Sequence, residues 1–295
     1  MERLEIPSYS FATKNYCLLM KPGIIMGNIV VTAGGFALAS KGAFDVPLFI
    51  ATMLGLALII ASSCVFNNYI DRETDKKMER TKGRGLATGA ISAYGAIMFG
   101  VFLGLSGAAV LYSFTNLITV AVAFTGFFVY VILYSFSKYY SMHGTLIGSV
   151  AGAIPPVVGY CAVSNRIDAG AVILFFMMVM WQMPHFFAIA IYRLDDYKEA
   201  SIPIMPVTRG MGETKFYMML YIIAFISATL LLSVYGYTGN GFFVLATIMG
   251  LGWIVLCAKG FSCKNDKQWA RQMFVFSLIV VMSLYVAVPF TVQVN

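Results

Sequence analysis

The stretch that decides the fold is Asn67-Asn68-Tyr69-Ile70-Asp71-Arg72-Glu73-Thr74-Asp75, where a long apolar run meets a run of basic residues. A helix turns by about 100° per residue, so Asn67, Asp71 and Asp75 share one face if the helix continues to Asp75. Two carboxylates and an amide on one face suit Mg²⁺, which takes oxygen ligands from one or two carboxylates and from substrate phosphates. A solvated helix end at a membrane edge has the same composition, and the spacing alone leaves both interpretations open.

Composition places the chain among membrane proteins. Of its 295 residues, 60% are hydrophobic and 11% are charged, whereas a soluble domain carries about a quarter charged residues. The net charge of +7 therefore indicates basic loops at a cytoplasmic face and no nucleic acid partner. The cysteines, at positions 17, 64, 161, 257 and 263, form no Cys-x-x-Cys pair, which argues against a disulfide framework or a zinc site.

Nine apolar segments are long enough to cross a membrane as helices, since a span needs about 20 residues. They cover residues 22–40, 47–69, 91–113, 116–136, 143–163, 169–192, 216–235, 241–259 and 270–292. The break at Ser113–Asn116 is the weakest division, and its loss would invert the topology after it. The pattern predicts an all-α integral membrane protein in which residues 1–295 form a single polytopic domain.

The distribution of basic residues supports this division. With the N-terminus inside, 18 of the 20 Lys and Arg residues, including Arg3, fall in cytoplasmic segments, and only Lys41 and Arg166 lie outside. The positive-inside rule expects such a bias. The C-terminus, from Thr291 to Asn295, then lies outside, on the periplasmic side of a bacterial membrane.

The N-terminal region contains one feature of a targeting segment. Ala37-Leu38-Ala39 resembles a signal-peptidase site, but the preceding segment is long and contains acids, so we expect the first span to be retained. An Arg- and Ser-rich, acid-poor extension of the transit-peptide kind is absent from the sequence. We therefore expect a bacterial plasma (inner) membrane protein.

Two of the cytoplasmic loops are long and carry both signs of charge. They cover about residues 70–90 and 193–215 and lie on the same face, so they are predicted to cap a cavity. Mg²⁺ together with Lys and Arg would neutralise a phosphate there. Anchoring of the same basic residues to anionic lipid head groups is the alternative.

Polar residues inside the spans are few. His185, in Trp181-Gln182-Met183-Pro184-His185, lies about 12 Å along a helix from Arg193 and is a functional candidate because ionisable residues in membranes usually have a function. It would otherwise satisfy the backbone carbonyl that Pro184 frees. Gly144, Gly148 and Gly152 are typical of close helix packing, and the following Pro155-Pro156 predicts a bend.

These residues also resemble a known family. Asn67-x-x-x-Asp71-x-x-x-Asp75, followed by Lys77-Met78-Glu79-Arg80-Thr81-Lys82, is similar to the first signature of the UbiA superfamily of intramembrane prenyltransferases. Other stretches resemble the branch that farnesylates haem. They are Lys21-Pro22-Gly23-Ile24, Tyr134-Ser135-x-x-Lys138, Gly148-x-x-x-Gly152-Ala153-x-Pro155-Pro156, Trp181-Gln182-Met183-Pro184-His185 and Asp196-Tyr197-x-x-Ala200-x-Ile202-Pro203-x-x-Pro206.

The resemblance implies nine helices around a central cavity and Mg²⁺-dependent transfer of a farnesyl group from farnesyl diphosphate to a vinyl group of haem B. It implies Asn67, Asp71, Asp75 and Asp196 as metal ligands, with Asp71, Asp75, Asp196 and His185 as the catalytic residues. His185 would orient haem or shuttle a proton. The implied diphosphate contacts are Asn67, Arg72, Lys82, Arg84, Tyr134, Ser135, Lys138 and Lys198. Membrane lipid surrounds the protein, and a terminal oxidase or a haem A synthase is the implied protein partner.

The second loop departs from the superfamily pattern. Many members carry Asp-x-x-x-Asp there, whereas Asp196 is followed four positions later by Ala200. Asp195 and Glu199 have that spacing in another register. The haem branch shares this loss, so we expect a second metal site with one carboxylate at most.

Two other functions remain open at this stage. A prenyltransferase acting on a quinone precursor would favour Asp-x-x-x-Asp in the second loop, which is absent. A transporter would be expected to show internal repeats with broken helices at matched positions. The sequence has one proline break, in the fifth span, without a matching partner, and no Asp or Glu deep in a span.

Overall fold

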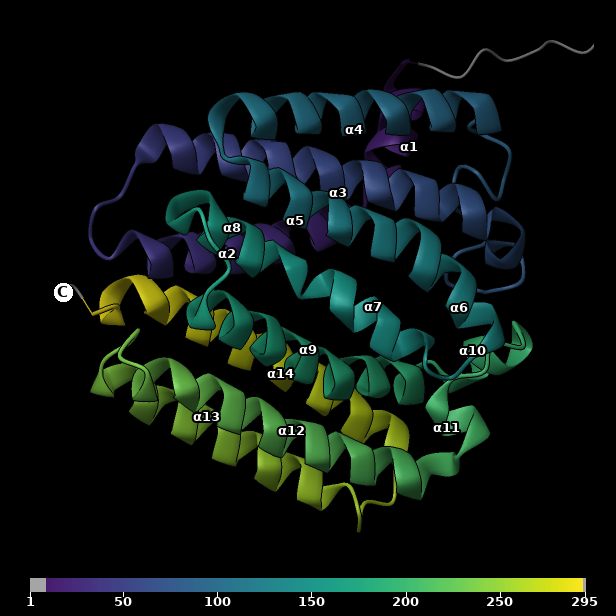
Figure 1. The fold of residues 1–295 in the computed structure, drawn as a ribbon. Helices are drawn as coiled ribbons and strands as arrows, with labels where there is room; N and C mark the ends of the chain where they lie inside the picture. Colours follow the sequence, from purple (N-terminus) through teal and green to yellow (C-terminus); the bar gives the residue numbers. More distant parts are fainter. Residues whose placement is uncertain (1–8, 294–295) are drawn as a thin grey trace, which may run out of the picture.

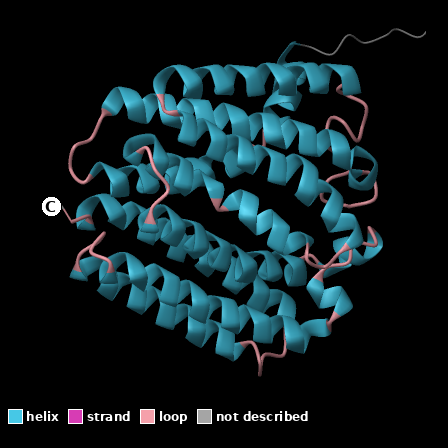
Figure 2. Cartoon of the chain, in the orientation of Figure 1, coloured by secondary structure: helices cyan, strands magenta, loops and turns pink. Residues whose placement is uncertain are grey.

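The computed structural model describes residues 9–293, which are helices joined by loops at the two ends of a bundle (Figure 2). Arg3 and residues 294–295, which the distribution of basic residues predicts on opposite sides of the membrane, lie outside the described residues. Within residues 9–293, nine segments are long and apolar enough to cross a membrane. The prediction of an all-α integral membrane protein with nine membrane helices is therefore confirmed.

The short helix α1 (Tyr9–Leu19) comes first. The spans that follow are α2 (Pro22–Ser40), α3 (Val46–Asp75), α4 (Ala93–Phe114), the run of α5 (Leu117–Phe128), η1 (Val129–Tyr134) and α6 (Ser135–Tyr140), the pair α7 (Gly144–Gly152) and α8 (Ile154–Ser164), α9 (Ala169–Tyr192), α12 (Gly210–Val234), α13 (Asn240–Lys259) and α14 (Asp266–Thr291). Between α9 and α12 lie α10 (Leu194–Glu199) and α11 (Met205–Thr208), at the end of the bundle away from the C-terminus (Figure 1).

The predicted spans match these helices closely except at four polar ends. The fourth span continues four residues past its predicted end at 136, to Tyr140. The helix α3 continues six residues past the predicted end at 69, α12 begins six residues before 216, and α14 begins four residues before 270. Charged residues end an apolar run without ending a helix. The extension of α3 to Asp75 meets the condition for Asn67, Asp71 and Asp75 to share one face.

The weakest predicted division is a real helix boundary. The helix α4 ends at Phe114, and Asn116 caps α5 by accepting a hydrogen bond from the backbone N–H of Thr119 at 2.9 Å. The Asn116 amide also donates to the carbonyl of Cys161 in α8 at 2.8 Å. An Asn at this position therefore ends one span, begins the next and ties both to the bundle.

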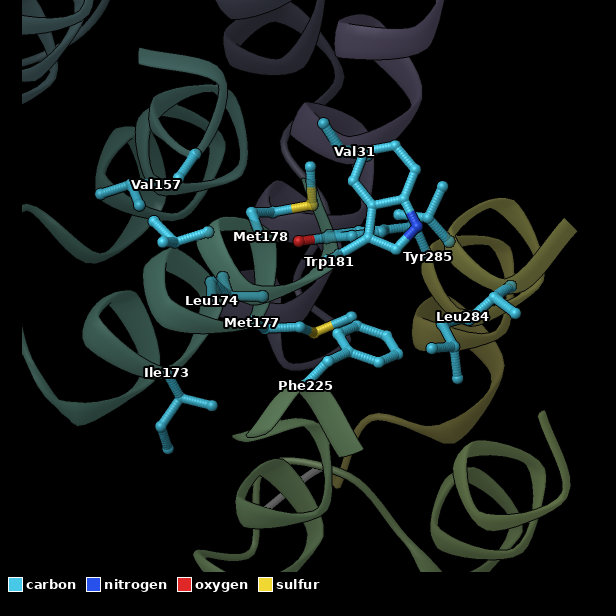
Figure 3. Packing of buried hydrophobic residues seen from close by; sticks show 14 of the residues in the cluster. Val31, Val157, Ile173, Leu174, Met177, Met178, Trp181, Phe225, Leu284 and Tyr285 are labelled. Atoms are coloured by element: carbon cyan, nitrogen blue, oxygen red, sulfur yellow. The ribbon is translucent and has the colours of Figure 1, made fainter. Parts of the chain in front are cut away.

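The helices form a closed ring with three members on its outside, which are α4, α12 and α13. The helix α14 packs against both α9 and α2, which joins the two halves of the chain, while α4 packs outside α3 and α13 lies against α12 and α14. Buried side chains of α2, α8, α12 and α14 gather around Met177, Met178 and Trp181 of α9 (Figure 3). The central helix α9 is therefore held from several sides.

The fifth span is broken where the paired prolines predict a bend. The helix α7 ends at Gly152, and α8 begins at Ile154 with prolines in its first turn, where a missing N–H costs little. The helix α8 packs against α2, α3, α5 and α9 and fills one half of the bundle. The break lets α7 follow a different path beside η1 and α9, which leaves the other half open.

Glycines set the spacing between α2 and α8. A Cβ atom added to Gly35 would lie 2.1 Å from the carbonyl oxygen of Pro156, and one added to Gly159 would lie 2.1 Å from the carbonyl oxygen of Thr32. Both obstacles are backbone atoms, which cannot rotate away. The contact therefore requires a residue without a side chain at both positions. Small residues commonly have this role where membrane helices approach closely.

We predict that Gly35→Ala lowers the free energy of unfolding by about 1–3 kcal/mol, the usual cost of overpacking. Gly27→Ala in the same helix is the control, because its added Cβ would meet only Met282 Cε at 4.0 Å. Thermal denaturation of the purified variants in detergent measures both. Equal midpoints for Gly35→Ala and wild type would show that the α2–α8 contact does not limit stability.

Candidate active site

One cavity of about 660 Å³ occupies the open half of the bundle. Its wall comes from α2, α3, α5, η1, α6, α7, the start of α8, α9 and α14, and from the segments after α3, α6 and α9. The end near these two segments is polar, and the deeper part is apolar, with Leu56, Ile59, Phe127, Phe186 and Phe274 in its wall. The geometry therefore joins a charged site to a hydrophobic one.

The polar face of α3 lies at the charged end. Asn67, Asp71 and Asp75 are 2%, 7% and 5% exposed, and all three line the cavity. Asp71 Oδ1 accepts a hydrogen bond from Tyr139 Oη at 2.6 Å, and its Oδ2 is paired with Lys138 Nζ. The Asn67 amide donates to Ser135 Oγ at 3.0 Å. Every member of this face is therefore buried and bonded to a partner.

A π-helical turn, η1, brings the partners of α3 into position. Such a turn inserts a residue into a helix and is frequent at functional sites. The hydroxyl of Ser135 donates to the carbonyl of Tyr130 at 3.1 Å, and the rings of Tyr130 and Tyr134 stack with centroids 5.4 Å apart. Gly148 of α7 leaves room for Tyr134, because an added Cβ would lie 2.9 Å from its ring.

Asp75 is paired with the segment that follows α3. Arg84 Nη1 donates to its two carboxylate oxygens at 3.0 and 2.8 Å. Two carboxylates at the C-terminal end of a helix face the negative end of its dipole. A buried carboxylate there requires a cation, so Arg84 and Lys138 allow α3 to keep Asp75 and Asp71 inside the cavity.

Lys21 is a further cation at this site. It precedes α2 in a left-handed conformation, with φ of 54°, and donates from Nζ to Asn67 Oδ1 at 2.7 Å. Burial lowers the pKa of its ammonium group to about 8. Among the described residues, the cavity wall has four Lys and Arg side chains, at positions 21, 80, 84 and 138, against the carboxylates of Asp71 and Asp75. The excess of positive charge suits an anionic ligand.

His185 and Gln182 lie on the cavity side of α9. Gln182 Nε2 donates to the carbonyl of Ser149 in α7 at 3.0 Å, and Gly152 makes room for its carbonyl oxygen, since an added Cβ would lie 2.0 Å away. His185 lines the deeper part of the cavity and is hydrogen-bonded through Nδ1 to Ser277 Oγ at 2.7 Å. The His185 ring is thus bonded to a hydroxyl of α14 and not to a carbonyl freed by Pro184.

Five predicted site residues do not line the cavity. Ser135 is fully buried behind the wall, where its hydroxyl accepts a hydrogen bond from the Asn67 amide. Arg72 lies over the Tyr69 ring at 4.3 Å, and Lys82 pairs with Glu79 at 2.6 Å on the surface. Lys198 is exposed. Asp196 is also outside the wall, and its buried Oδ2 has no hydrogen-bond partner among the described residues. The neighbouring Tyr197 lines the cavity in its place, and burial raises the pKa of its phenol.

The charged end fits a hard cation that is shared with a phosphate. Asn67, Asp71 and Asp75 offer oxygen donors, which Mg²⁺ prefers. The described residues contain no group of three His, Cys, Asp or Glu side chains that would enclose a metal. A Mg²⁺ site of this kind takes one or two carboxylates and completes its shell with water and substrate phosphate, so the donor set fits without such a group.

The structure adds residues that sequence reasoning missed as site members. Lys21, Arg80, Tyr130 and Tyr139 line the cavity. In the sequence, Lys21 is one of the cytoplasmic basic residues and part of a family motif, and its place directly before Pro22 at the start of a span is the signal that points to a site. The remaining three lie in a loop or in the π-helical span, whose phase the sequence does not give.

The fold and this cavity define a polytopic prenyltransferase. The UbiA prenyltransferase family model matches residues 28–279, and the chain belongs to that family. Two solved structures share the fold. A digeranylgeranylglyceryl phosphate synthase has a TM-score of 0.79 at 18% identity, covering 95% of this chain and 98% of that one. A UbiA homologue from Archaeoglobus fulgidus bound to GPP and Mg²⁺ has a TM-score of 0.67 at 14% identity, covering 94% and 99%.

A curated relative is much nearer in sequence. The protoheme IX farnesyltransferase of Protochlamydia amoebophila (strain UWE25) is 52% identical over 275 residues, which are 93% of this chain and 97% of the relative. The resemblance to the haem-farnesylating branch of the superfamily is thereby confirmed. The alternatives of a quinone-precursor prenyltransferase and a transporter are not favoured.

We predict that Arg84→Gln destabilises the protein more than Lys82→Gln does. Loss of Arg84 leaves Asp75 buried at a helix C-terminus without a cation, whereas the exposed pair of Lys82 and Glu79 contributes at most about 1 kcal/mol. Thermal denaturation in detergent compares the two variants. A larger loss of stability in Lys82→Gln would contradict the pairing described for Asp75.

Proposed function

We propose that this protein transfers the farnesyl group of farnesyl diphosphate to a vinyl group of haem B, with addition of water, to give haem O and diphosphate. The observation that carries the proposal is the single cavity that joins the charged face of α3 to an apolar chamber beside His185. The name of the 52% identical relative supports the same reaction.

The charged end holds the diphosphate in this proposal. Asn67, Asp71 and Asp75 are the residues that would hold Mg²⁺, and the distant Archaeoglobus fulgidus homologue bound to GPP and Mg²⁺ supports a metal site of this kind. Bound Mg²⁺ neutralises the negative charge that develops on the departing diphosphate. Lys21, Lys138 and Arg84 are already held by hydrogen bonds at this end, so they can stabilise the same charge without reorganisation.

The deeper chamber protects the carbocation. Breaking the C–O bond of an allylic diphosphate leaves a farnesyl cation that must meet the vinyl carbon before water does. Apolar walls such as Phe127, Phe186 and Phe274 exclude water. The stacked rings of Tyr130 and Tyr134 line the cavity close to Asn67 and Lys138, and aromatic faces attract a cation. Water then adds to the cation formed on the haem side, and a proton is released.

The proposal assigns secondary roles to the two capping segments. We propose that residues 1–295 form one membrane domain whose segments at about 70–90 and 193–215 cover the charged end. Four predicted site residues of these segments do not line the cavity wall, so they act at the charged end only if the segments move. They are Arg72, Lys82, Asp196 and Lys198. The product would pass to a terminal oxidase or a haem A synthase.

We also propose a bacterial inner membrane location, with the N-terminus and the charged end of the cavity cytoplasmic. The positions of 18 of the 20 basic residues support this orientation.

The reaction itself is tested by incubating the purified protein with haem B, farnesyl diphosphate and Mg²⁺. We expect haem O by mass spectrometry, in amounts that fall to background when EDTA removes the metal. A folded protein that forms no haem O in the presence of Mg²⁺ would contradict the proposal.

We predict that Asp71→Asn and Asp75→Asn each lower haem O formation at least about 100-fold, since each removes charge from the proposed metal site. Glu73→Gln is the matched control and should retain activity, because Glu73 is exposed on the same helix and pairs with Lys76. Membrane insertion is checked by the yield of folded protein. Full activity in either aspartate variant would refute the metal role of that residue.

The orientation predicts the activity of alkaline phosphatase fusions, because this enzyme folds only outside the cytoplasm. A fusion after Asn165, between α8 and α9, should be active, and a fusion after Lys264, between α13 and α14, should be inactive. An inactive fusion after Asn165 together with an active fusion after Lys264 would contradict the proposed orientation in the membrane.

A further inference from the structure

The ring of His185 is held in one orientation by three contacts. It stacks on the indole of Trp181, with centroids 4.7 Å apart and planes inclined by 24°, and it lies 5.0 Å from the ring of Phe274. Its Nδ1 is 2.7 Å from Ser277 Oγ. Trp181 is itself fixed, because its Nε1 donates to the carbonyl of Ser277 at 2.8 Å and its indole belongs to the buried core (Figure 3).

The bonding of Ser277 determines which nitrogen of His185 carries the proton. A serine hydroxyl has a single hydrogen, and that of Ser277 is donated to the carbonyl of Phe274 at 2.6 Å. Ser277 Oγ must therefore accept from His185, so Nδ1 carries the hydrogen. In the neutral imidazole, Nε2 then holds a lone pair. Burial among aromatic rings favours that neutral form.

This lone pair is open to the cavity. His185 lines the cavity wall, and Nε2 has no hydrogen-bond donor among residues 9–293. It is also not one of the fully enclosed polar atoms that lack a partner in this part of the chain. A rigid imidazole with Nδ1–H bonded to an oxygen and a free Nε2 is the arrangement that proteins use for metal ligation.

We propose that Nε2 of His185 coordinates the iron of the haem substrate. This inference rests on the proposed function, in which haem B is the substrate, and it names a protein ligand for the haem iron. Imidazole nitrogen is a strong ligand for haem iron. The bond would fix the macrocycle at a set depth, about 12 Å along α9 from Arg193, and so hold a vinyl group in the apolar chamber below the diphosphate.

The chain offers a matched control. The sequence has two histidines, and His143 is exposed just before α7. His143→Ala removes an imidazole without changing the cavity wall, so it separates specific ligation from adventitious binding at the surface. His185→Gln keeps a side chain that can donate to Ser277 but lacks the imidazole, and it serves where His185→Ala folds poorly.

The experiment titrates purified protein in lipid nanodiscs with ferric haem B and records absorption and electron paramagnetic resonance spectra. Wild type and His143→Ala should show imidazole-ligated iron, and His185→Ala and His185→Gln should lose that spectrum and regain it with free imidazole. Ser277→Ala should keep the ligand with roughly tenfold weaker haem affinity, the usual effect of losing an outer-shell hydrogen bond. Metal-free protoporphyrin IX should bind wild type and the His185 variants within about twofold.

The outcomes separate this inference from the proposed function. If both His185 variants keep the imidazole-ligated spectrum while wild type makes haem O, the ligand is wrong and the function stands. If His185→Gln loses haem O formation with an unchanged spectrum, His185 acts in proton transfer, and the inference is also overturned. Imidazole-ligated haem in a wild type that forms no haem O from farnesyl diphosphate would refute the function alone. A wild type that binds no haem would refute both.

Discussion

The pairing of buried carboxylates with cations from other elements is the interaction on which the rest of the site depends. Asp71 and Asp75 point into a cavity from the C-terminal end of α3, where the helix dipole disfavours negative charge. Lys138 on α6 and Arg84 after α3 supply the compensating charges. Each pair therefore fixes a second element against α3. The same pairs also place cations beside the carboxylates before any ligand arrives.

The architecture around these pairs follows from close helix contacts. Gly35 and Gly159 bring α2 and α8 into backbone contact, which fills one half of the bundle. The break after Gly152 then turns α7 away from that contact and toward η1 and α9. The cavity lies beside this break, with Gly152 and Pro155 in its wall.

Much of the fold could be predicted from the sequence because it depends on properties of continuous segments, such as apolar length, helix period and capping residues. Spans follow from apolar runs, and Asn116 and Pro155-Pro156 mark real boundaries. The shared face of Asn67, Asp71 and Asp75 follows from helix period alone. The same period places Arg72 about 100° away from Asp71, and the structure finds it over Tyr69 instead of in the cavity.

The remaining parts of the site depend on information that the sequence pattern lacks. Lys82 and Arg84 lie in an irregular segment, so nothing periodic predicted that only Arg84 would reach α3. The π-helical turn η1 shifts the phase of the fourth span, so a helix period of 3.6 residues per turn does not predict the place of Tyr139. Lys21 joins Asn67 across 46 positions, a contact that only the packing of α2 on α3 creates.

The paired carboxylates and cations should together form a site for a metal-bound diphosphate. Calorimetric titration of farnesyl diphosphate into the purified wild-type protein, with Mg²⁺ and then with EDTA, tests this most directly. We predict saturable binding of one farnesyl diphosphate per chain in Mg²⁺ and at least about tenfold weaker binding in EDTA. Equal affinity under both conditions would contradict a metal-bound diphosphate at these residues.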